Sequence, residues 1–523
     1  MRPLRASLLP AAVLSVALLA PDAVAQLSVH RTGGTFGEGL DYAITGGTPF
    51  NAFVFVISAN TGPLPLSIVD PTDPRVMEVG IDLMQYWVIA GLDASGAANI
   101  HYGLPGTSTL TGVPIHAQAV TLPGPVMLFD EISNRTSFRL SLPARSTYTI
   151  EDAPLGITGH AATSLPGGDV LLTGGGARDA GGFSAGFGNV LRYDHQMGRF
   201  DLLANQLTTP RSAHTATLLQ DGTVLLVGGT DSLGNPTAAV ERIDAATGAA
   251  ISTSALDAPR VFHSATLLGN GKVLVVGGTS SIDFSNPLGA LGAVLASTRL
   301  YDPTSNTWSN GPNLPQSRAG HRATLLTDGR VLVTGGLAVT FFLGVPIPSF
   351  SNDARRYDPN TNGFTAAGTF SGGRAFHAQA RLADGRVMLV GGAEGDFLAQ
   401  TFNARSDSRI YDPTTNSWSN GPSISQARAY AELVVSGSRK PTLIGGLASV
   451  DITTTTGAAA DTIEVLDLAV PSWTTVGTQL MPRPIGAVAL TDSASAPRAL
   501  TTGESSNALG GATDFTAETF VLP

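Results

Sequence analysis

One pattern recurs about every 50 to 60 residues between Gly159 and Pro523 and constrains the fold of this chain more than any other feature. The full pattern is an Arg-x-x-His motif, an apolar run, an Asp-Gly or Asn-Gly turn, a second apolar run that ends in Gly-Gly, a Tyr-Asp-Pro motif and an aromatic residue. Individual copies lack some of these parts; two of them, for example, keep Arg428 and Arg483 without the histidine. A repeat of this length is one supersecondary unit that cannot bury its own faces, so it must pack on its neighbours. The chain is therefore predicted to be a repeat protein.

The segments within each repeat predict strands. Short β-branched runs such as Val273–Val276 precede each glycine doublet, and Asp221-Gly222 is typical of the turn in an antiparallel hairpin. A third strand is predicted to end at Tyr301-Asp302-Pro303, and an aromatic residue six positions past the aspartate marks a fourth. Four short antiparallel strands per unit, repeated radially, predict the blades of a β-propeller. Seven units are marked by Gly174-Gly175, Gly228-Gly229, Gly277-Gly278, Gly335-Gly336, Gly391-Gly392, Gly445-Gly446 and the degenerate Gly503-Glu504.

The glycine doublet, the Tyr-Asp-Pro motif and Trp308, six residues past Asp302, together resemble the Kelch repeat, and the repeat region covers about 70% of the chain. The resemblance implies a closed ring of blades in which the glycines pack where inner strands meet. The Kelch family that the chain resembles also includes galactose-oxidase-like propellers, whose copper-radical centre uses a tyrosine cross-linked to a cysteine. This chain has no cysteine, so that centre is not expected and no cofactor is predicted. The tyrosines of the repeat positions are Tyr193, Tyr301, Tyr357 and Tyr411.

The pattern divides the chain into three parts. Residues 1–25 have the layout of a cleaved signal peptide, with an apolar stretch from Leu8 to Ala20 before the small residues at 23–25. Residues 26–145 lack the repeat, and their β-rich runs predict a small β-sandwich. Residues 146–523 are predicted to form a seven-bladed propeller. The strand at 147–151 is expected to close the ring by completing the last blade, which supplies only three strands of its own.

The composition of the chain limits the classes of partner that it can bind. A formal charge of −10 argues against nucleic acid and anionic membranes as ligands, and the absence of cysteine excludes disulfides and thiolate metal sites. No segment after residue 25 is long and apolar enough to span a bilayer. The signal-peptide layout predicts a secreted, periplasmic or cell-surface protein, and hence an extracellular or envelope protein or glycan as partner.

Arginine and histidine recur at one repeat position and are the first candidate binding residues. Because the motif opens the innermost strand, its side chains could ring the mouth of the central channel as a cationic collar for a carboxylate or sulfate. Alternatively, a residue present in nearly every blade holds the blade together. No metal site is predicted, because repeated positions spread around a circle instead of converging. The candidates are Arg211, Arg260, Arg318, Arg374, His214, His263, His321 and His377.

The long segments after each glycine doublet differ between blades and supply the remaining candidates, Phe341, Phe342, Glu394 and Asp396. Such loops leave a blade on the face that carries the Arg-x-x-His motifs, and variable loops on a rigid scaffold are where recognition usually lies. The favoured function is a non-catalytic module that binds a protein or glycan there. A glycosidase or lyase that uses loop acids, and a structural spacer in an envelope assembly, stay open. No spacing selects catalytic residues.

Overall fold

A computed structural model describes most of the chain from residue 27 onward. The elements in the described part are β-strands with one short 3₁₀ helix, η2 (Leu291–Ala293), so the predicted all-β fold is confirmed. No helix there is long and apolar enough to cross a bilayer. The predicted signal peptide, residues 1–25, lies outside the described residues. The described ranges are 27–33, 39–58, 61–66, 71, 75–79, 86–103, 114–122, 131–133, 136–139, 147–150, 159–179, 182–195, 199–251, 253–282, 291–396, 401–435, 440–451, 456–478, 487–491, 498–504 and 515–521.

The first part of the chain forms two antiparallel sheets that share an apolar core. Tyr42 of one sheet packs against Phe55 of the other with ring centroids 4.7 Å apart. Strand β3 is buried on its other side as well, where Met77 of hairpin β4–β5 covers Val56, which explains its continuous apolar run. The sheets, in spatial order, are β1 (Ser28–Gly33), β2 (Gly39–Thr45) and β7 (Ala98–Gly103); β6 (Tyr86–Gly91), β3 (Ala52–Ser58), β8 (Pro114–Leu122) and β9 (Thr136–Arg139); and the hairpin β4 (Thr61–Pro65) and β5 (Val76–Val79).

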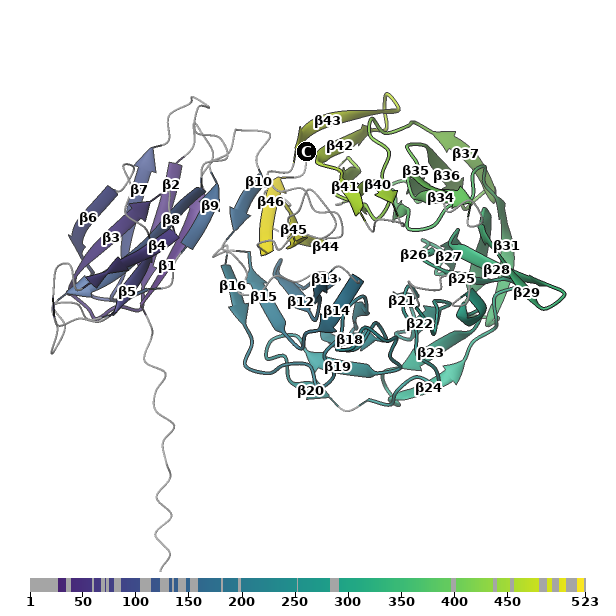
Figure 1. Ribbon diagram of the computed structural model, residues 1–523, viewed down its shortest axis with the longest axis horizontal. Coiled ribbons are helices and arrows are strands. Elements are labelled where there is room, and N and C mark those ends of the chain that lie inside the picture. Colours follow the sequence, from purple (N-terminus) through teal and green to yellow (C-terminus); the bar gives the residue numbers. More distant parts are fainter. Residues whose placement is uncertain are drawn as a thin grey trace, which may run out of the picture.

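Seven four-stranded antiparallel sheets follow, and we call them blades 1 to 7 (Figure 1). Listed from inner to outer strand, they are blade 1, β11 (Ala161–Ser164), β12 (Val170–Thr173), β15 (Val190–Asp194) and β16 (Arg199–Leu202); blade 2, β17 (Thr215–Leu218), β18 (Thr223–Val227), β19 (Val240–Asp244) and β20 (Ala250–Ile251); blade 3, β21 (Ser264–Leu267), β22 (Val273–Val276), β23 (Thr298–Asp302) and β24 (Thr307–Asn310); blade 4, β26 (Arg322–Leu325), β27 (Val331–Thr334), β30 (Asp353–Asp358) and β31 (Gly363–Thr369); blade 5, β32 (Ala378–Arg381), β33 (Val387–Val390), β36 (Ser408–Asp412) and β37 (Ser417–Gly421); blade 6, β38 (Glu432–Val434), β39 (Thr442–Ile444), β42 (Thr462–Asp467) and β43 (Ser472–Thr478); blade 7, β44 (Ala487–Thr491), β45 (Arg498–Glu504), β46 (Phe515–Val521) and β10 (Thr147–Ile150).

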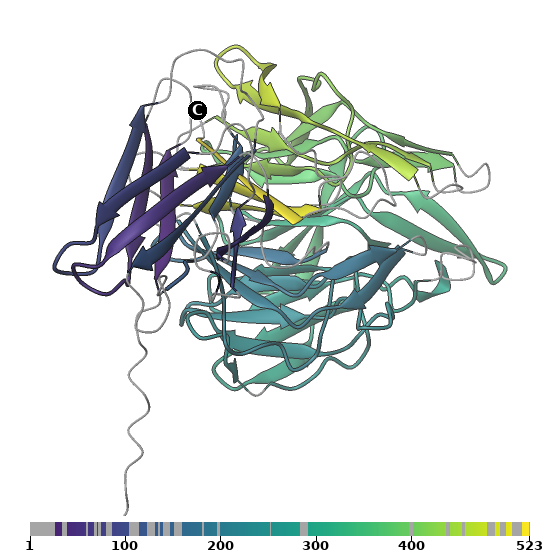
Figure 2. The same cartoon turned by 60° about the vertical axis from the view of Figure 1, so that its left-hand side comes forward.

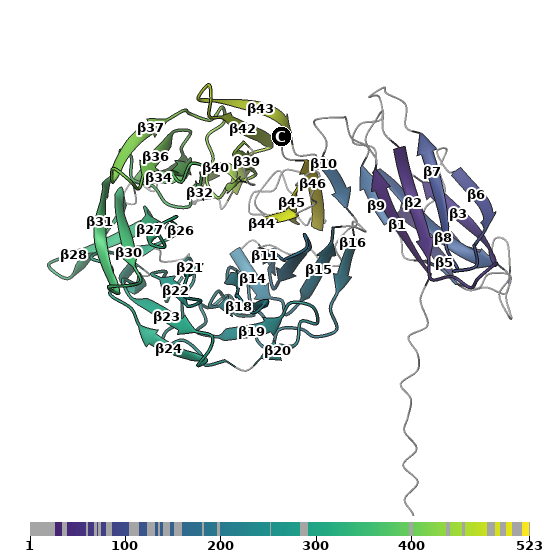
Figure 3. The same cartoon turned by 180° about the vertical axis from the view of Figure 1, so that it is seen from behind.

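The blades form a closed ring. Each inner strand lies beside the inner strand of the next blade, and β44 of blade 7 lies beside β11 of blade 1 (Figure 3). Strand β10, which precedes blade 1 in the sequence, pairs with β46 from Thr147↔Phe520 to Ile150↔Ala517 and so joins the first part of the ring to its last blade. Strand β9 lies next to β10, and the N-terminal sheets stand beside the ring (Figure 2).

Within the ranges that the structure describes, smaller hairpins connect the second and third strands of four blades. The hairpin of blade 4 recruits a third strand from the loop before the blade, so that β25, β28 and β29 form one sheet. Neighbouring hairpins contact one another, since β29 lies beside β34 and β35 lies beside β40. The strands are β13 (Gly176–Asp179) and β14 (Gly182–Gly186); β25 (Ser317–Ala319), β28 (Leu337–Phe342) and β29 (Val345–Phe350); β34 (Ala393–Asp396) and β35 (Thr401–Ala404); and β40 (Leu447–Asp451) and β41 (Thr456–Ala459).

The glycine doublet is required by the contact between blades. Gly228 and Gly229 adopt φ angles of 59° and 93°, a region that disfavours residues with a Cβ atom. A Cβ atom on Gly228 would lie 2.3 Å from the carbonyl oxygen of Arg260, and one on Gly229 would lie 2.3 Å from that of Ser212. The doublet therefore allows backbones of adjacent blades to touch, as the resemblance to Kelch propellers implied.

The Tyr-Asp-Pro motif and its aromatic partner build the outer half of a blade. In blade 3 the Tyr301 ring packs against Trp308, and its hydroxyl donates to the Asn306 side chain over 2.8 Å. Asn306 itself has a left-handed backbone with φ of 55°, which asparagine tolerates better than most residues. The Trp308 indole N–H donates to the Ser254 carbonyl of blade 2 over 2.9 Å, so this aromatic residue also links two blades.

Candidate functional site

The Arg-x-x-His motifs and the long connections after the glycine doublets lie on one face of the ring, which we call the loop face. Residues inside the motifs pair with residues that directly follow a doublet, as in Ser212↔Thr230 and Ala375↔Ala393. In blade 4 the pairing extends into the sheet formed by β25 and β28. The candidate residues named from the sequence therefore share a face, although they differ greatly in exposure.

The four predicted arginines are buried inside their blades. Arg374 has no exposed surface; its guanidinium donates to the carbonyls of Gly391 and Asp407 over 2.9 and 3.1 Å and to the Asp407 carboxylate over 2.8 Å. Burial lowers the pKa of Arg374 to about 10, against the opposing charge of Asp407. Arg428 repeats this arrangement with Glu464 as its carboxylate.

The same arginines also join adjacent blades through their backbones. The carbonyl of each accepts a hydrogen bond from the second glycine of the preceding blade's doublet, for example Gly392 to Arg428 over 2.9 Å. The guanidinium and the backbone of one residue thus hold two glycine doublets at once. This contact set accounts for an arginine in successive blades without any ligand.

The histidines bond across the same blade boundaries. Nε2 of His263 lies 3.0 Å from the Thr215 hydroxyl of the preceding blade, and Nε2 of His321 lies 2.9 Å from the Ser264 hydroxyl. His160 closes the ring by contacting Thr502 of blade 7 over 2.6 Å. Burial, followed by the charge of the neighbouring arginine, lowers the pKa of His263 and of His321 to about 3, so both are neutral at physiological pH.

These placements favour the structural interpretation of the motif over the anion collar. None of the eight predicted arginine and histidine side chains is more than 6% exposed, and a collar needs guanidinium groups that face solvent. The residues are Arg211, Arg260, Arg318, Arg374, His214, His263, His321 and His377.

Phe341 and Phe342 lie at the tip of hairpin β28–β29, which projects from the rim of the ring (Figure 1). They are 62% and 65% exposed, and Leu343 between the two strands is 89% exposed. Val345 pairs with Phe342, and together with Ile347 it extends the exposed apolar surface of Phe342 along β29, whereas Phe341 projects from the opposite side of the hairpin. We call these five residues the hairpin tip.

Glu394 and Asp396 stand on β34, in the neighbouring hairpin. Glu394 forms an ion pair with Arg405, whose guanidinium also bonds Asp407 over 2.7 Å. Burial alone would raise the pKa of Asp407, but hydrogen bonds from Arg405 and the charge of Arg374 hold it at about 2. Glu394 is therefore the outer member of an ion-pair network that leads to the buried arginine, and Asp396 is exposed beside it.

Sequence reasoning missed a set of aromatic residues at the channel mouth. The residue directly before the histidine position of the motif, which is Ala431 in blade 6, has a left-handed backbone in blades 2 to 6. It is Phe262, Phe376 or Tyr430 in three of them. Phe376 stacks on Tyr430 with centroids 4.3 Å apart and meets Phe262 edge-on at 5.4 Å. Gly320 makes room, since a Cβ atom there would lie 2.6 Å from the Phe376 ring. The signal was in the sequence, because the three aromatics share one repeat position.

A charged pair lies below these aromatic rings inside the channel. Arg322 of β26 reaches past blade 5 to Glu432 of β38 over 2.7 Å, and it donates to the His377 carbonyl over 2.9 Å on the way. Both side chains remain about one-third exposed. Glu432 also lines a cavity of ≈ 340 Å³ in the channel, together with Arg381 and other residues of β11, β32, β38 and β44. We call Phe262, Phe376, Tyr430, Arg322 and Glu432 the channel-mouth cluster.

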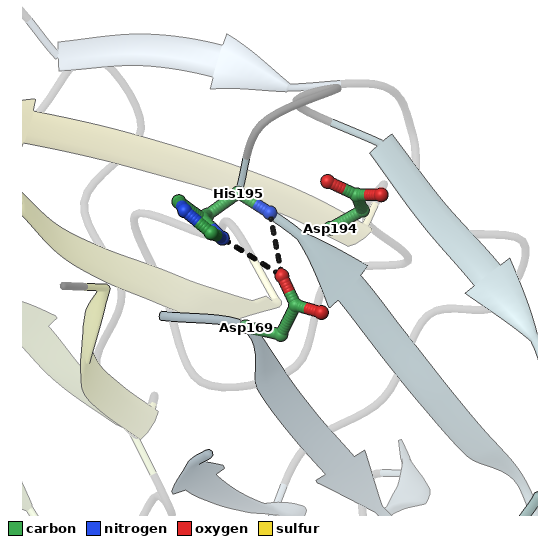
Figure 4. A group of neighbouring side chains, drawn as sticks. All are labelled: Asp169, Asp194 and His195. Atoms are coloured by element: carbon green, nitrogen blue, oxygen red, sulfur yellow. Dashed lines mark hydrogen bonds and ion pairs between the residues drawn. The ribbon is translucent and has the colours of Figure 1, made fainter. Parts of the chain in front are cut away.

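One group of acid and histidine side chains in the described part of the chain is close enough to share an ion: Asp169, Asp194 and His195 of blade 1, with ligand atoms within 4.8 Å of one another (Figure 4). It lies at the end of the blade away from the glycine doublet. Asp169 already accepts from the backbone N–H of His195 over 3.1 Å and from Arg192 Nε over 2.8 Å. Burial raises the pKa of Asp169, but hydrogen bonds with the His195 ring, 2.8 Å away, and with Arg192 outweigh burial, so that this pKa lies below its ordinary value. The group thus has a structural role without an ion.

A family model and a solved structure with a TM-score of 0.53 agree with this architecture. Residues 259–315, which contain blade 3, match the family model of the Kelch motif. A solved structure of a fungal alcohol oxidase of the AA5 family in complex with copper is 17% identical, with a TM-score of 0.53 over 73% of this chain and 76% of that chain. The structure of YjhT is 15% identical, with a TM-score of 0.45 over 62% of this chain and 98% of that chain. The predicted resemblance to Kelch-repeat propellers is confirmed; at these identities the likeness concerns the fold alone.

The residues of this chain do not fit the copper-radical centre of galactose-oxidase-like Kelch propellers. The chain offers no cysteine for a cross-linked tyrosine. The hydroxyls of Tyr301, Tyr357 and Tyr411 each donate to an asparagine of their own blade over 2.7 to 3.0 Å, at the outer turns and away from the channel.

Proposed function

We propose that this chain is a non-catalytic interaction module that binds a partner protein through the hairpin tip on the loop face. The observation that carries the proposal is the exposure of adjacent large apolar side chains at that tip, up to 89% for Leu343. Contiguous apolar surface of this kind on a soluble protein marks an interaction site more often than chance placement does.

The turn at the tip adds a conformational argument. Phe342 pairs with Val345, so Leu343 and Gly344 form a two-residue turn with φ angles of 50° and 83°. Positive φ at both positions favours Asn-Gly or Asp-Gly, and leucine is both strained and exposed there. An apolar residue that destabilises the free protein on two counts is explained when a partner buries it.

The chemistry of the hairpin points to a protein with an apolar groove. Residues 331–352 contain no charged side chain, so nothing in the hairpin attracts an anionic lipid surface or a charged peptide. Pro346 and Pro348 lie on β29, the edge strand, and lack the N–H groups that a partner strand would pair with. Side chains of the tip must therefore supply the contact. Because residues 1–25 have the pattern of a signal peptide, we place this interaction outside the cytoplasm.

The test is photo-cross-linking in cells from a light-activated amino acid placed at Leu343 of the full chain. Leu233, which is 81% exposed in blade 2, is the matched control position. We expect a saturable cross-linked protein from position 343 and none from position 233. Once purified, that partner should bind the Leu343→Asn variant about 10- to 100-fold more weakly than wild type, as expected for the loss of one buried leucine.

Leu343→Asn is informative because asparagine suits the turn. The variant should be at least as stable as wild type in thermal unfolding, so a loss of binding cannot be ascribed to misfolding. Equal affinity of the two proteins for the partner would refute the proposal. So would cross-linking confined to a second copy of this chain.

A second candidate, recognition of a glycan at the channel mouth, is favoured by the channel-mouth cluster. Half-buried aromatic rings beside a partly exposed arginine and carboxylate are the combination that small-ligand sites use, an apolar platform with few polar groups. Glycan arrays with the full chain would test it. Binding that is lost in Tyr430→Ala and kept in Leu343→Asn would support this candidate over the first. Turnover of a bound glycan that disappears in Glu394→Gln would instead support a carbohydrate-active enzyme.

A further inference from the structure

Two blades show how a buried motif arginine is neutralised when an arginine also occupies the third strand. In blade 4, Asp353 accepts from Arg318 over 2.9 Å and from Arg355 over 2.8 Å. In blade 5, Asp407 accepts in the same way from Arg374 over 2.8 Å and from Arg409 over 2.7 Å. One carboxylate thus lies between two guanidinium groups.

Blades 2 and 6 neutralise the charge of the buried motif arginine with a different residue. Their third strands place a glutamate where blades 4 and 5 have the second arginine, and it bonds the motif arginine directly: Glu241 lies 2.6 Å from Arg211, and Glu464 lies 2.8 Å from Arg428. In these four blades the buried guanidinium has a carboxylate within hydrogen-bond distance.

Blade 3 has both the motif arginine and the third-strand arginine, but it has no aspartate at the position of Asp353 and Asp407. The carbonyl of Ser297 accepts from the first glycine of the doublet, as the carbonyls of Asp353 and Asp407 do, so Ser297 occupies the aspartate position. The second arginine is Arg299, two residues further on. The structure therefore has two guanidinium groups at a position where blades 4 and 5 supply a carboxylate and blade 3 supplies a hydroxymethyl group.

Arg260 shows the consequence. Its side chain has no exposed surface, and Nη1 donates to the Gly277 carbonyl over 3.2 Å, but Nε and Nη2 are buried without a hydrogen-bond partner among the residues that the structure describes. The carboxylate of Asp257 lies 3.8 Å from Nη2, is half exposed and already bonds Arg299 over 2.8 Å. Leaving donors of a buried charged group unpaired is costly, so a ligand that pairs them would be bound favourably.

We propose that blade 3 binds a small monovalent anion, a carboxylate such as formate or a chloride ion, between Arg260 and Arg299 in the place that Asp353 fills in blade 4. Aspartate has two more heavy atoms than serine, so the ligand must be small. The two guanidinium forks match the geometry of a carboxylate and also suit a halide. The site is independent of the hairpin tip and of the channel-mouth cluster.

The test compares thermal unfolding of the full chain and of Ser297→Asp, which carries its own carboxylate. Sodium formate, sodium chloride and sodium gluconate are titrated at matched ionic strength; gluconate is too large for the site and controls for general salt effects. We expect Ser297→Asp to have the higher Tm at low salt. Formate or chloride should raise the Tm of wild type more than that of the variant. At a free anion concentration ten times the Kd, binding should raise the folding equilibrium constant of wild type about 11-fold.

A second variant covers the case in which Ser297→Asp folds poorly. Asp353→Ser creates the same vacancy in blade 4 and should gain a dependence on formate or chloride that wild-type blade 4 lacks. Crystals soaked in bromide should show anomalous scattering between Arg260 and Arg299. The proposal is overturned when wild type and Ser297→Asp respond equally to every anion, or when bromide sites form elsewhere and not beside Arg260. A lower Tm of Asp257→Asn with no anion response in wild type would assign the counter-charge to Asp257 and overturn it as well.

Discussion

The buried histidines predict that the ring is sensitive to mild acid. His263 and His321 are 6% and 4% exposed, and burial lowers the pKa of each from an ordinary value of 6.5 to about 3. Below pH 6.5 the unfolded chain binds a proton at these positions and the folded protein does not. These histidines therefore do not lower the free energy of unfolding above pH 6.5. They lower it progressively as the pH drops through the window from 6.5 to 3.

The magnitude follows from the two pKa values. At pH 5 each of these histidines favours the unfolded state by about 2 kcal/mol, and each further pH unit adds about 1.4 kcal/mol. The pKa values of His214 and His377 are also lowered well below 6.5 by burial, so they act in the same direction. Unfolding in urea between pH 7.5 and 4.5 measures the total.

Two variants separate titration from packing. His263→Gln removes a titrating group but keeps a side chain that can bond Thr215, and the slope of stability against pH between 6 and 4 should fall by about 1.4 kcal/mol per unit. Thr215→Val removes the same hydrogen bond without removing the histidine, so it should lower stability while the slope stays as in wild type. An unchanged slope in His263→Gln would refute the reasoning.

Three further outcomes are expected from single substitutions. Glu464→Gln should lower the free energy of unfolding by about 3 to 5 kcal/mol in urea, because it leaves Arg428 charged and buried without its carboxylate; a loss below about 1 kcal/mol would contradict this. Trp418→Ala should cost about 3 kcal/mol, the lower end for a large aromatic, since the indole is only half buried but bonds the preceding blade; a Tm equal to that of wild type would show that the link carries no stability. Gly320→Ala should displace the Phe376 ring, seen as a changed near-ultraviolet circular dichroism signal, and an unaltered signal would show that the ring is not held there.

The repeat in the sequence was sufficient for the propeller because its signals are local. Gly228 must accept a positive φ angle whatever surrounds it, and Tyr301 and Trp308 pair through a register that one hairpin determines. The turn chemistry was predicted less well. Of the pair Asp221-Gly222 only the glycine adopts a positive φ angle, while the aspartate side chain accepts a hydrogen bond from the Thr223 N–H.

The candidate site was predicted in part. Phe341 and Phe342 were named for their apolar character in a long connection, and the structure places them exposed at a hairpin tip. The arginines and histidines were named for a shared position, but a sequence does not show whether such a position faces solvent or the neighbouring blade. The aromatic residues Phe262, Phe376 and Tyr430 share one repeat position, but they belong to different repeats and contact one another only when their blades pack around the axis.

The amino-acid sequence alone determined the repeating unit, its strands and its turns, because backbone sterics and hydrophobic periodicity act over a few neighbouring residues. Burial of the motif arginines, the Arg322–Glu432 pair across blade 5 and the missing counter-charge beside Arg260 were decided only by the tertiary structure. Each depends on the distance between groups from different blades or strands. Such distances are set when the sheets pack around a common axis, and no spacing along the chain encodes them directly.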